Sequence, residues 1–440
     1  MCVSMPNTLD SWFSHIEHLH YQRMDFGLER IGIVAQKLSL THFSCPVITV
    51  AGTNGKGSCA KTLESIYVAA GFKVGLYTSP HLLEFNERIR IQNHPVSDTN
   101  LMRAFSVIEE ARQNVTLSFF EFITLAALYL FREAKLDVVI LEVGLGGRLD
   151  AVNIVESDIA VVTSIALDHQ EYLGDDRESI AFEKTSIARA GKYLVCGEEN
   201  PPHTIAKTVL EKQAKLFQID RDFFYQDNTY SFYDPRSHFS DPTQHVYRLT
   251  ILKPHLKPQN IATALAVIYL LRNSLMITEK DVQEGVKNTI WPGRFEFFSF
   301  PFSGVLDVAH NPHATVWLAK QYAALPRVNK TIAVVGMLKD KDMIETLRPL
   351  LSLVDLWCVC SLSSLTGRGS DGVTMVDFLH SQKIKSCYTF DSVSSAMDFV
   401  STEKGDRVLI FGSFYTVAEA KKWLEENALL TVYKKLQHYR

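Results

Sequence analysis

A glycine-rich segment close to the N-terminus contains the residue types that hold a nucleotide phosphate. The run VITVAGTNGKGS, residues 47–58, joins an apolar stretch to three glycines, a lysine and a serine. Glycines let backbone N–H groups approach phosphate oxygens, and the start of a following helix adds a partial positive charge. Lys56 adds a full charge, and the Ser58 hydroxyl can serve Mg²⁺ or phosphate. We therefore predict a phosphate-binding loop made of Gly52, Thr53, Asn54, Gly55, Lys56, Gly57 and Ser58.

The spacing of this loop departs from the common G-x-x-x-x-G-K-[ST] pattern. Only Thr53 and Asn54 separate Gly52 from Gly55, and a further glycine stands between the lysine and the serine. The alternative interpretation is a plain glycine turn between a strand and a helix. Because strand, loop, lysine and helix all occur in order, the phosphate-binding loop is favoured.

Such a loop needs a strand before it and a helix after it, and the sequence predicts both. A helix is expected over 58–70, where apolar residues fall on one stripe, and Gly71 ends it. Continuous apolar runs suit strands that are buried on both faces of a parallel sheet. We expect such strands at 46–51, 73–77, 136–143 and 158–165.

The C-terminal part of the chain alternates in the same way, which predicts a second, smaller sheet domain. Residues 224–243 are rich in Asp, Ser, Tyr and Pro and predict a less regular β or loop region, followed by a helix at 260–271. The turn-rich Trp291-Pro-Gly-Arg294 predicts the domain boundary. Later strands are expected at 304–308, 331–336, 354–360 and 407–411, with helices between them and after Thr416.

The expected fold is therefore α/β, with a mostly parallel-sheet P-loop ATPase domain over 1–293 and a smaller Rossmann-like domain over 294–440. The 440 residues, 46% of them hydrophobic and 21% charged, fit a soluble globular protein of more than one domain. A net charge of −4 argues against a nucleic-acid binder. No apolar run reaches the roughly 20 residues of a membrane span, and no secretion signal is expected.

Seven cysteines without a C-x-x-C pair indicate reduced thiols in a cytoplasmic protein. Cys358 and Cys360 lie two apart in an apolar run, so they share one face of an expected strand. Core packing is the favoured interpretation of this pair, ahead of a zinc site.

Seven further motifs follow the phosphate loop, and together they resemble a known family. They are TSPHLLEFNERIR from 78, SFFE from 118, LEVGLGGRLDAVN from 141, TSIALDHQEYLG from 163, WPGRFE from 291, DVAHNPHA from 307 and FGSFYTVA from 411. The set resembles the Mur ligase superfamily and, more narrowly, its folate branch, the bacterial folylpolyglutamate synthases/dihydrofolate synthases. The 51 residues before Gly52 are too few for the extra N-terminal domain of the cell-wall ligases.

The resemblance implies an ATP-dependent amide ligase that joins L-glutamate to a folate-type carboxylate through an acyl phosphate. It implies Mg²⁺ held by Ser79, Glu142 and His169, and a Lys184 that is carbamylated by CO₂. Carbamylation requires a neutral amine, so this site must depress the lysine pKa. The alternatives are a helix-capping or core role for His169 and a surface helix lysine beside Glu183.

The resemblance also assigns the nucleotide and the incoming amino acid to residues of this chain. Catalytic roles fall to Lys56, Lys184, Asp307 and His310, of which Asp307 and His310 face glutamate and the γ-phosphate. Arg294, Asn311 and Asn260 match nucleotide-contacting positions, and Ser413 matches one near glutamate. Gln259 stands beside Asn260 instead of two residues before it and does not match. Helix N-capping by Asn311 and a surface ion pair of Arg294 remain the alternatives.

The pterin is assigned by resemblance to Phe26, Ser118, Phe120, Asp150 and Ala151. An aromatic ring such as Phe120 can stack on a pterin, and Asp150 can accept its N–H groups. The alternative is that the phenylalanines around 119–122 form helix core. This pocket favours a bifunctional enzyme that uses both dihydropteroate and folates.

Three other functions compete with this interpretation. The first is a folylpolyglutamate synthase without dihydropteroate activity. The second is a P-loop NTPase of non-ligase function, which would explain GTNGKGS but not the D-x-A-H-N motif at 307–311. The third is a non-catalytic binding module. The expected partners are small molecules only, with no nucleic acid and no membrane, and the protein is expected to act as a monomer.

Overall fold

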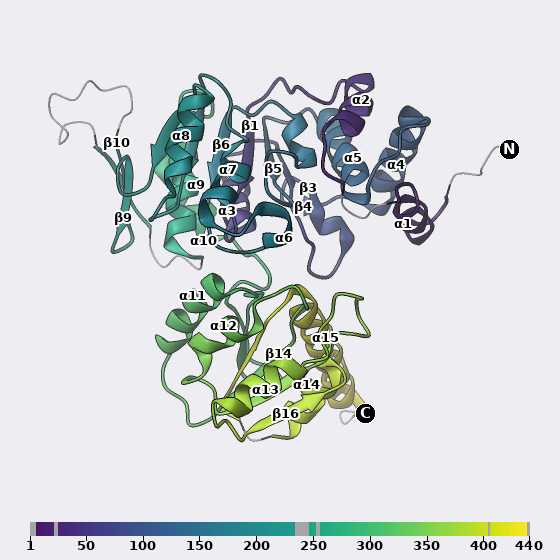
Figure 1. Ribbon diagram of the computed structural model, residues 1–440, viewed down its shortest axis with the longest axis vertical. Coiled ribbons are helices and arrows are strands. Elements are labelled where there is room, and N and C mark those ends of the chain that lie inside the picture. The colour runs from purple at the N-terminus through teal and green to yellow at the C-terminus, as the bar shows by residue number, and fades with distance from the viewer. Residues whose placement is uncertain (1–5, 22–24, 234–245, 252–255, 404, 438–440) are drawn as a thin grey trace. The chain divides into compact units, whose positions relative to one another are not determined.

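The computed structural model describes residues 6–21, 25–233, 246–251, 256–403 and 405–437. The chain forms two compact units, Met1–Ile290 and Trp291–Arg440, and each has a sheet of its own (Figure 1). The division falls beside the turn-rich segment in which the sequence analysis placed the boundary.

An eight-stranded sheet formed by described residues lies at the centre of the first unit. Its strands are β1 (Val47–Ala51), β2 (Val74–Tyr77), β3 (Ile89–Ile91), β4 (His94–Pro95), β5 (Val138–Glu142), β6 (Ile159–Val162), β7 (Tyr193–Cys196) and β8 (Lys215–Gln218). Their order is β4-β3-β2-β5-β1-β6-β7-β8. The strands β2, β5, β1, β6, β7 and β8 run parallel to one another. By contrast, β3 pairs antiparallel with β2, and β4 pairs antiparallel with β3. The carboxyl ends of β1, β2, β5 and β6 therefore meet at one edge.

Helices cover both faces of this sheet (Figure 1). They are α1 (Leu9–Glu17), α2 (Glu29–Lys37), α3 (Lys56–Ala69), α4 (Asp98–Arg112), α5 (Phe119–Ala134), α6 (Gln170–Leu173), α7 (Arg177–Thr185), α8 (His203–Glu211), α9 (Pro258–Leu271) and α10 (Glu279–Lys287), with the short helices η1 (Phe85–Arg88) and η2 (Ala151–Ile154). Alternate residues of each strand face opposite sides. Val139 and Leu141 join one core with α1, α2, α4, α5, α7 and α8, while α3 packs against α9 and α10.

A small antiparallel sheet of β9 (Phe223–Gln226), β10 (Thr229–Tyr233) and β11 (Val246–Thr250) also belongs to the first unit. It occupies part of the region predicted as irregular β or loop. Residues 234–243 of that prediction lie outside the described residues.

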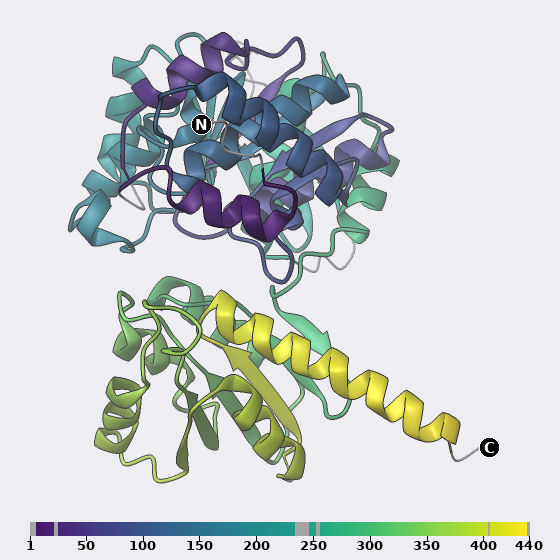
Figure 2. The same cartoon turned by 90° about the vertical axis from the view of Figure 1, so that its right-hand side faces the viewer.

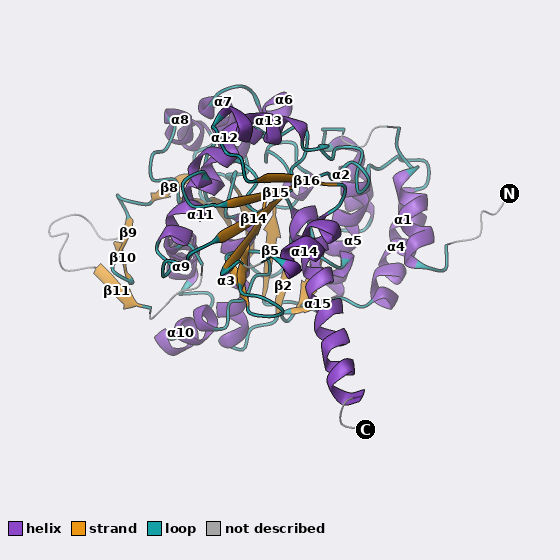
Figure 3. Ribbon diagram, turned by 90° about the horizontal axis from the view of Figure 1, so that it is seen from below, coloured by secondary structure: helices purple, strands orange, loops and turns teal. Residues whose placement is uncertain are grey.

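The second unit contains a six-stranded sheet of described residues. Its strands are β12 (Glu296–Phe298), β13 (Gly304–Leu306), β14 (Thr331–Val335), β15 (Leu356–Cys360), β16 (Cys387–Phe390) and β17 (Arg407–Phe411). The order is β12-β13-β17-β14-β15-β16, and every neighbouring pair is parallel except β12 with β13. Figure 3 shows β14, β15 and β16 side by side.

The helices of the second unit follow its strands in alternation. They are α11 (Pro312–Ala323), α12 (Met343–Leu347), η3 (Arg348–Leu350), α13 (Val373–Ser381), α14 (Val393–Thr402) and α15 (Phe414–Gln437). Figure 2 shows α15 as one long helix whose C-terminal half extends past this unit's sheet. Cys358 and Cys360 are both fully buried, which confirms their prediction as core residues.

The expected strands are all present, although most are shorter than their apolar runs. The helix after the phosphate loop begins at Lys56, two residues earlier than predicted, and the helix at 260–271 begins at Pro258. No helix in the described part of the chain is long and apolar enough to cross a membrane.

Candidate functional site

The glycine-rich loop joins the end of β1 to the start of α3, as the sequence predicted. Gly55 caps α3 with a φ of 86°, and Gly52 has a φ of 146°, a region that side chains rarely adopt. A Cβ at Gly52 would collide with Thr163, and one at Gly55 would collide with Asn260. The Lys56 ammonium donates to the Gly52 carbonyl at 2.9 Å and the Thr53 carbonyl at 3.4 Å. The loop therefore leaves no space for side chains at Gly52 and Gly55, and the Lys56 side chain folds back onto the loop's carbonyl groups.

Asn260 approaches this loop from the N-terminal end of α9. Its buried side chain faces Gly55, so the expected nucleotide-contacting position does lie at the phosphate loop. Gln259 has a different role, because its side-chain amide donates to the Gly197 carbonyl at 2.5 Å. This contact agrees with the mismatch noted in the sequence.

Lys184 lies in α7 and is only 4% exposed. The alternative interpretation as a surface lysine is therefore wrong. Burial and, after it, the positive charge of Lys56 lower the pKa of its amine to about 7, against the opposite effects of Asp168, Asp150 and Glu183. The charges of Lys56, Asp168, Asp150 and Glu183 thus act on the Lys184 amine, and the depressed pKa meets the requirement for carbamylation.

Asp150 is buried, and its carboxylate accepts the backbone N–H groups of Leu145 at 2.9 Å and Val152 at 3.1 Å. Burial raises its pKa to about 6, although these hydrogen bonds and Lys56 lower it. The neighbouring Ala151 is also buried. The carboxylate is therefore oriented by backbone before any substrate binds.

Glu142 is the last residue of β5, and Ser79 follows the adjacent strand β2. The Glu142 carboxylate accepts the Thr78 hydroxyl and, at 3.3 Å, the Ser79 backbone N–H. Glu142 is buried. The structure therefore brings two of the expected metal ligands together at the carboxyl edge of the sheet.

His169 ends the loop after β6 and begins α6 with a φ of 54°. Its side chain does not cap the helix, and it is 33% exposed. Neither the capping nor the core alternative fits these observations. Its Nε2 lies 4.0 Å from the Asp168 carboxylate, which links it to the charges around Lys184.

The expected pterin residues fall into two local groups in the first unit. Phe120 packs on Gly144, where an added Cβ would lie 2.6 Å from its ring, and its ring centroid is 5.9 Å from that of Tyr77. Phe26 is 41% exposed, with its ring 5.6 Å from Tyr172 of α6. Phe122 is fully buried, whereas Phe119 and Phe120 are partly buried and pack against the same core, so the helix-core alternative holds for Phe122 and stays open for Phe120.

Ser118 caps the N-terminus of α5. Its hydroxyl accepts the Glu121 N–H at 3.4 Å, and the Glu121 carboxylate accepts the Ser118 N–H at 2.7 Å. This reciprocal pair is a capping box. Ser118 thus positions the helix that carries Phe120.

In the second unit, Asp307 and His310 follow β13. The buried Asp307 carboxylate accepts the N–H groups of Phe295 and Ala309, both at 2.8 Å. Burial raises its pKa, whereas Arg294 opposes this effect. The His310 Nδ1 lies 2.9 Å from the Val308 carbonyl, so Nδ1 carries the proton and donates.

Arg294, Asn311 and Ser413 lie around the same end of this sheet. The Arg294 guanidinium lies 5.1 Å from the centre of the Phe414 ring, and its charge opposes the burial that raises the pKa of Asp307. Asn311 caps α11 by accepting the Ala314 N–H at 3.0 Å, which is the capping alternative. The Ser413 hydroxyl accepts the Thr416 N–H at 3.0 Å.

Comparison with known proteins identifies the family of the chain. Residues 50–268 match the Mur ligase middle domain, and residues 293–414 match the Mur ligase glutamate ligase domain. The dihydrofolate synthase/folylpolyglutamate synthase of Escherichia coli strain K12 is 44% identical over 419 residues, which cover 95% of this chain and 96% of the relative. The chain belongs to the dihydrofolate synthase/folylpolyglutamate synthase family of Mur ligases.

Solved structures of this family have the same fold. E. coli FolC in complex with DHPP and ADP has a TM-score of 0.88 and 42% identity, covering 97% of this chain and 100% of that one. A bifunctional folylpolyglutamate synthase/dihydrofolate synthase with Mn, AMPPNP and L-glutamate bound has a TM-score of 0.87 and 40% identity, with the same coverage. The predicted family and α/β fold class are thereby confirmed.

The candidate metal ligands of the first unit, Glu142 and Ser79, fit a magnesium ion only together with a nucleotide. Among the described residues, no three His, Cys, Asp or Glu side chains gather into a metal-binding group. Mg²⁺ usually keeps several waters and takes one or two carboxylates plus substrate phosphates. The buried Glu142, beside Ser79, supplies such a partial set of oxygen ligands.

The sequence analysis did not identify several residues that contact the phosphate loop, Glu142 or Lys184. Thr163 and Ser164 bond to the phosphate loop, Thr78 bonds to Glu142, and Asp168 acts on Lys184. Each lies within a motif that had been noted, and Thr78 and Asp168 stand next to residues that had been assigned.

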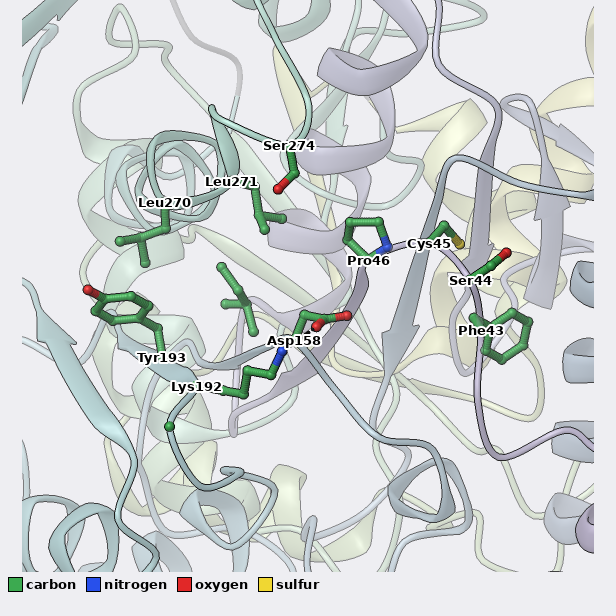
Figure 4. A pocket seen from close by; sticks show the side chains of 12 residues that line it. Phe43, Ser44, Cys45, Pro46, Asp158, Lys192, Tyr193, Leu270, Leu271 and Ser274 are labelled. Atoms are coloured by element: carbon green, nitrogen blue, oxygen red, sulfur yellow. Dashed lines mark hydrogen bonds and ion pairs between the residues drawn. The ribbon is translucent and has the colours of Figure 1, made fainter.

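A pocket of about 490 Å³ lies at the opposite edge of the first sheet, beside the starts of β1, β6 and β7 (Figure 4). Its walls include Phe43, Pro46 and Leu271. Asp158 and Lys192 form an ion pair of 2.7 Å there. None of the residues assigned to phosphate, metal or pterin lines this pocket, so it is separate from the candidate catalytic site at the carboxyl edge.

Proposed function

We propose that this protein is an ATP-dependent ligase that adds L-glutamate to dihydropteroate, giving dihydrofolate, and to the γ-carboxylate of folates. The observation that carries this proposal is the 44% identity to a curated dihydrofolate synthase/folylpolyglutamate synthase along nearly the full length of both chains. The electrostatic interaction of the buried Lys184 with Lys56, Asp150 and Asp168 supports it.

The domain spanning 1–293 is proposed to bind ATP through residues 52–58, with Asn260 beside Gly55 as a further nucleotide contact. Ser79, Glu142, His169 and a carbamylated Lys184 would hold Mg²⁺ together with the phosphates. When bound, Mg²⁺ supplies Lewis-acid stabilisation of phosphoryl charge. In carbamylation the neutral Lys184 amine adds to CO₂ and releases one proton, so that a neutral group becomes an anionic carbamate.

The proposed reaction has two steps. The substrate carboxylate attacks the γ-phosphorus of ATP, so that ADP leaves and an acyl phosphate forms. Lys56 stabilises the charge of the phosphoryl group during this transfer. The glutamate amine then attacks the acyl carbon, and phosphate leaves together with the proton of the amine. The domain spanning 294–440 is proposed to hold glutamate through Asp307, His310 and Ser413 and phosphate oxygens through Arg294 and Asn311.

The pterin is proposed to lie against Phe120, with Asp150 accepting its N–H groups and with Phe26, Ser118 and Ala151 nearby. The exposed ring of Phe26 beside Tyr172 supports an aromatic contact. Ser118 would act by fixing the start of α5.

The deciding experiment is an assay of purified protein with dihydropteroate, ATP and glutamate. We expect equal amounts of phosphate and dihydrofolate, and loss of both in Lys56→Ala. The exposed Lys207, on α8, provides a matched control as Lys207→Ala. Turnover of a reduced folate but not of dihydropteroate would leave tail extension alone. ATP hydrolysis without any acceptor would point to a P-loop NTPase of another function.

We further propose that the protein acts as a monomer on these small molecules in the cytoplasm. Light scattering after size-exclusion chromatography, compared with the chain mass of 49.7 kDa, tests the first point. A mass near twice this value would overturn it.

A further inference from the structure

The loop after β6, residues 163–169, is attached to the phosphate loop by hydrogen bonds. The Ser164 carbonyl accepts the Thr53 N–H at 2.8 Å, and the Ser164 hydroxyl accepts the Asn54 N–H at 3.0 Å. The Thr53 hydroxyl donates to the Ala166 carbonyl at 3.1 Å and accepts the Ala166 N–H at 3.0 Å. The same loop ends at His169. The conformation of the 163–169 loop therefore affects the position of the phosphate loop and of His169, an expected metal ligand.

Ile165 lies in this loop between Ser164 and Ala166, and an ion pair of side chains from outside the loop holds it. The Glu198 carboxylate accepts the Ile165 N–H at 2.7 Å, and the Arg177 Nε donates to the Ile165 carbonyl at 2.9 Å. Arg177 and Glu198 pair with each other at 3.2 Å. One residue thus has both backbone groups bound to charged side chains from elsewhere in the unit.

The pair is itself fixed at its outer end. A second nitrogen of Arg177 donates to the Asn200 carbonyl at 2.7 Å, and Glu198 accepts the Asn200 N–H at 3.1 Å. Glu198 is buried, whereas the Arg177 side chain is 36% exposed. Charge-assisted hydrogen bonds of this kind are stronger and more directional than neutral ones. The Arg177–Glu198 pair therefore fixes the backbone position of Ile165.

We propose that Arg177 and Glu198 are positioning residues for nucleotide binding, because their hydrogen bonds to the Ile165 backbone hold the 163–169 loop against the phosphate loop. The proposal rests on the proposed function only in taking the nucleotide to be Mg·ATP. Neither residue bonds to the phosphate loop. Their effect passes through Ile165 to Ser164 and Ala166, and from there to Thr53 and Asn54.

Arg177→Ala is the first test, because a partly exposed side chain can be removed without emptying the core. We expect Mg·ATP, titrated by calorimetry without acceptor or glutamate, to bind about tenfold more weakly, as a lost charge-assisted hydrogen bond implies. Glu198→Gln is the second variant, because its amide oxygen still accepts the Ile165 N–H while its pairing with Arg177 is weakened. It should bind more tightly than Glu198→Ala.

Glu178 provides a matched control on the same helix. Its carboxylate accepts the His203 and Thr204 N–H groups at the start of α8, at 3.1 and 2.8 Å, and does not bond to the 163–169 loop. Glu178→Ala should lower the melting temperature and leave the dissociation constant of Mg·ATP unchanged. This control separates a positioning effect from general loss of stability.

Wild-type dissociation constants in folded Arg177→Ala and Glu198→Gln would overturn the inference. An equal loss of affinity in Glu178→Ala would do the same. Failure of the proposed function is a separate result, since a wild-type protein that binds Mg·ATP but never ligates glutamate would contradict that proposal and not this one.

Discussion

Lys184 is the residue whose environment departs most from that of an ordinary lysine. It is buried beside Lys56, and its pKa falls from 10.5 to about 7. In the folded chain the amine is therefore largely neutral above pH 7, whereas in the unfolded chain it stays charged up to about pH 10. Between these values the unfolded state binds the extra proton, so this group makes stability rise with pH.

Lys184→Met should remove this part of the pH dependence, because methionine is uncharged and of similar length. The wild-type free energy of unfolding should rise relative to that of the variant by about 1 kcal/mol per pH unit between pH 7 and 9. Urea unfolding in CO₂-free buffer at pH 7, 8 and 9 measures the difference. Parallel pH profiles for the two proteins would mean that the amine is not depressed.

The sequence predicted which residues carry the chemistry better than it predicted how they are held. Lys184 and Glu142 stood out through motifs, yet the burial of Lys184 depends on contacts from α7 to distant loops. Ser118 and Asn311 act as helix caps, a role that their spacing to the next turn already allowed. Arg177 and Glu198 could not be found, because they meet only in the folded chain.

At the scale of elements, the two ends of α3 offer a direct comparison. Gly55 caps its start with a φ of 86°, and Gly71 follows its end with a φ of 85°. An added Cβ would collide with Asn260 at Gly55 but would meet nothing within 4 Å at Gly71. The two glycines thus share a positive φ and differ in their surroundings.

Gly71→Ala should cost about 1 kcal/mol of stability, the backbone penalty of a left-handed alanine, and leave Mg·ATP binding unchanged. Gly55→Ala adds the displacement of Asn260 and should weaken Mg·ATP binding by about 10²-fold, since misplaced binding groups have effects of this size. Chemical unfolding and calorimetric titration give the two quantities. Similar binding losses in both variants would show that backbone strain, and not Asn260, is responsible.

Strands were predictable where they are buried on both faces. β1 and β5 are entirely buried and appear as continuous apolar runs. β8, β12 and β16 escaped because they lie at sheet edges and are partly exposed, so that apolar runs are absent. β7 was missed although it is mostly buried.

At the scale of the whole molecule, each unit has a core of its own. Ile140 is fully buried in β5 of the first unit, and Ile332 is fully buried in β14 of the second. Each unit also contains two buried cysteines, Cys59 and Cys196 in the first and Cys358 and Cys360 in the second. The reaction of these thiols with a reagent therefore reports the opening of each unit separately.

Two matched variants use this division. Ile140→Val and Ile332→Val each remove one buried methylene group, at a cost of roughly 1 kcal/mol, which corresponds to about a fivefold increase in opening. Ile140→Val should accelerate labelling of Cys59 and Cys196 alone, and Ile332→Val that of Cys358 and Cys360 alone, as followed by mass spectrometry. If either variant accelerated all four thiols equally, the chain would open as one cooperative body, and independent cores would no longer describe it.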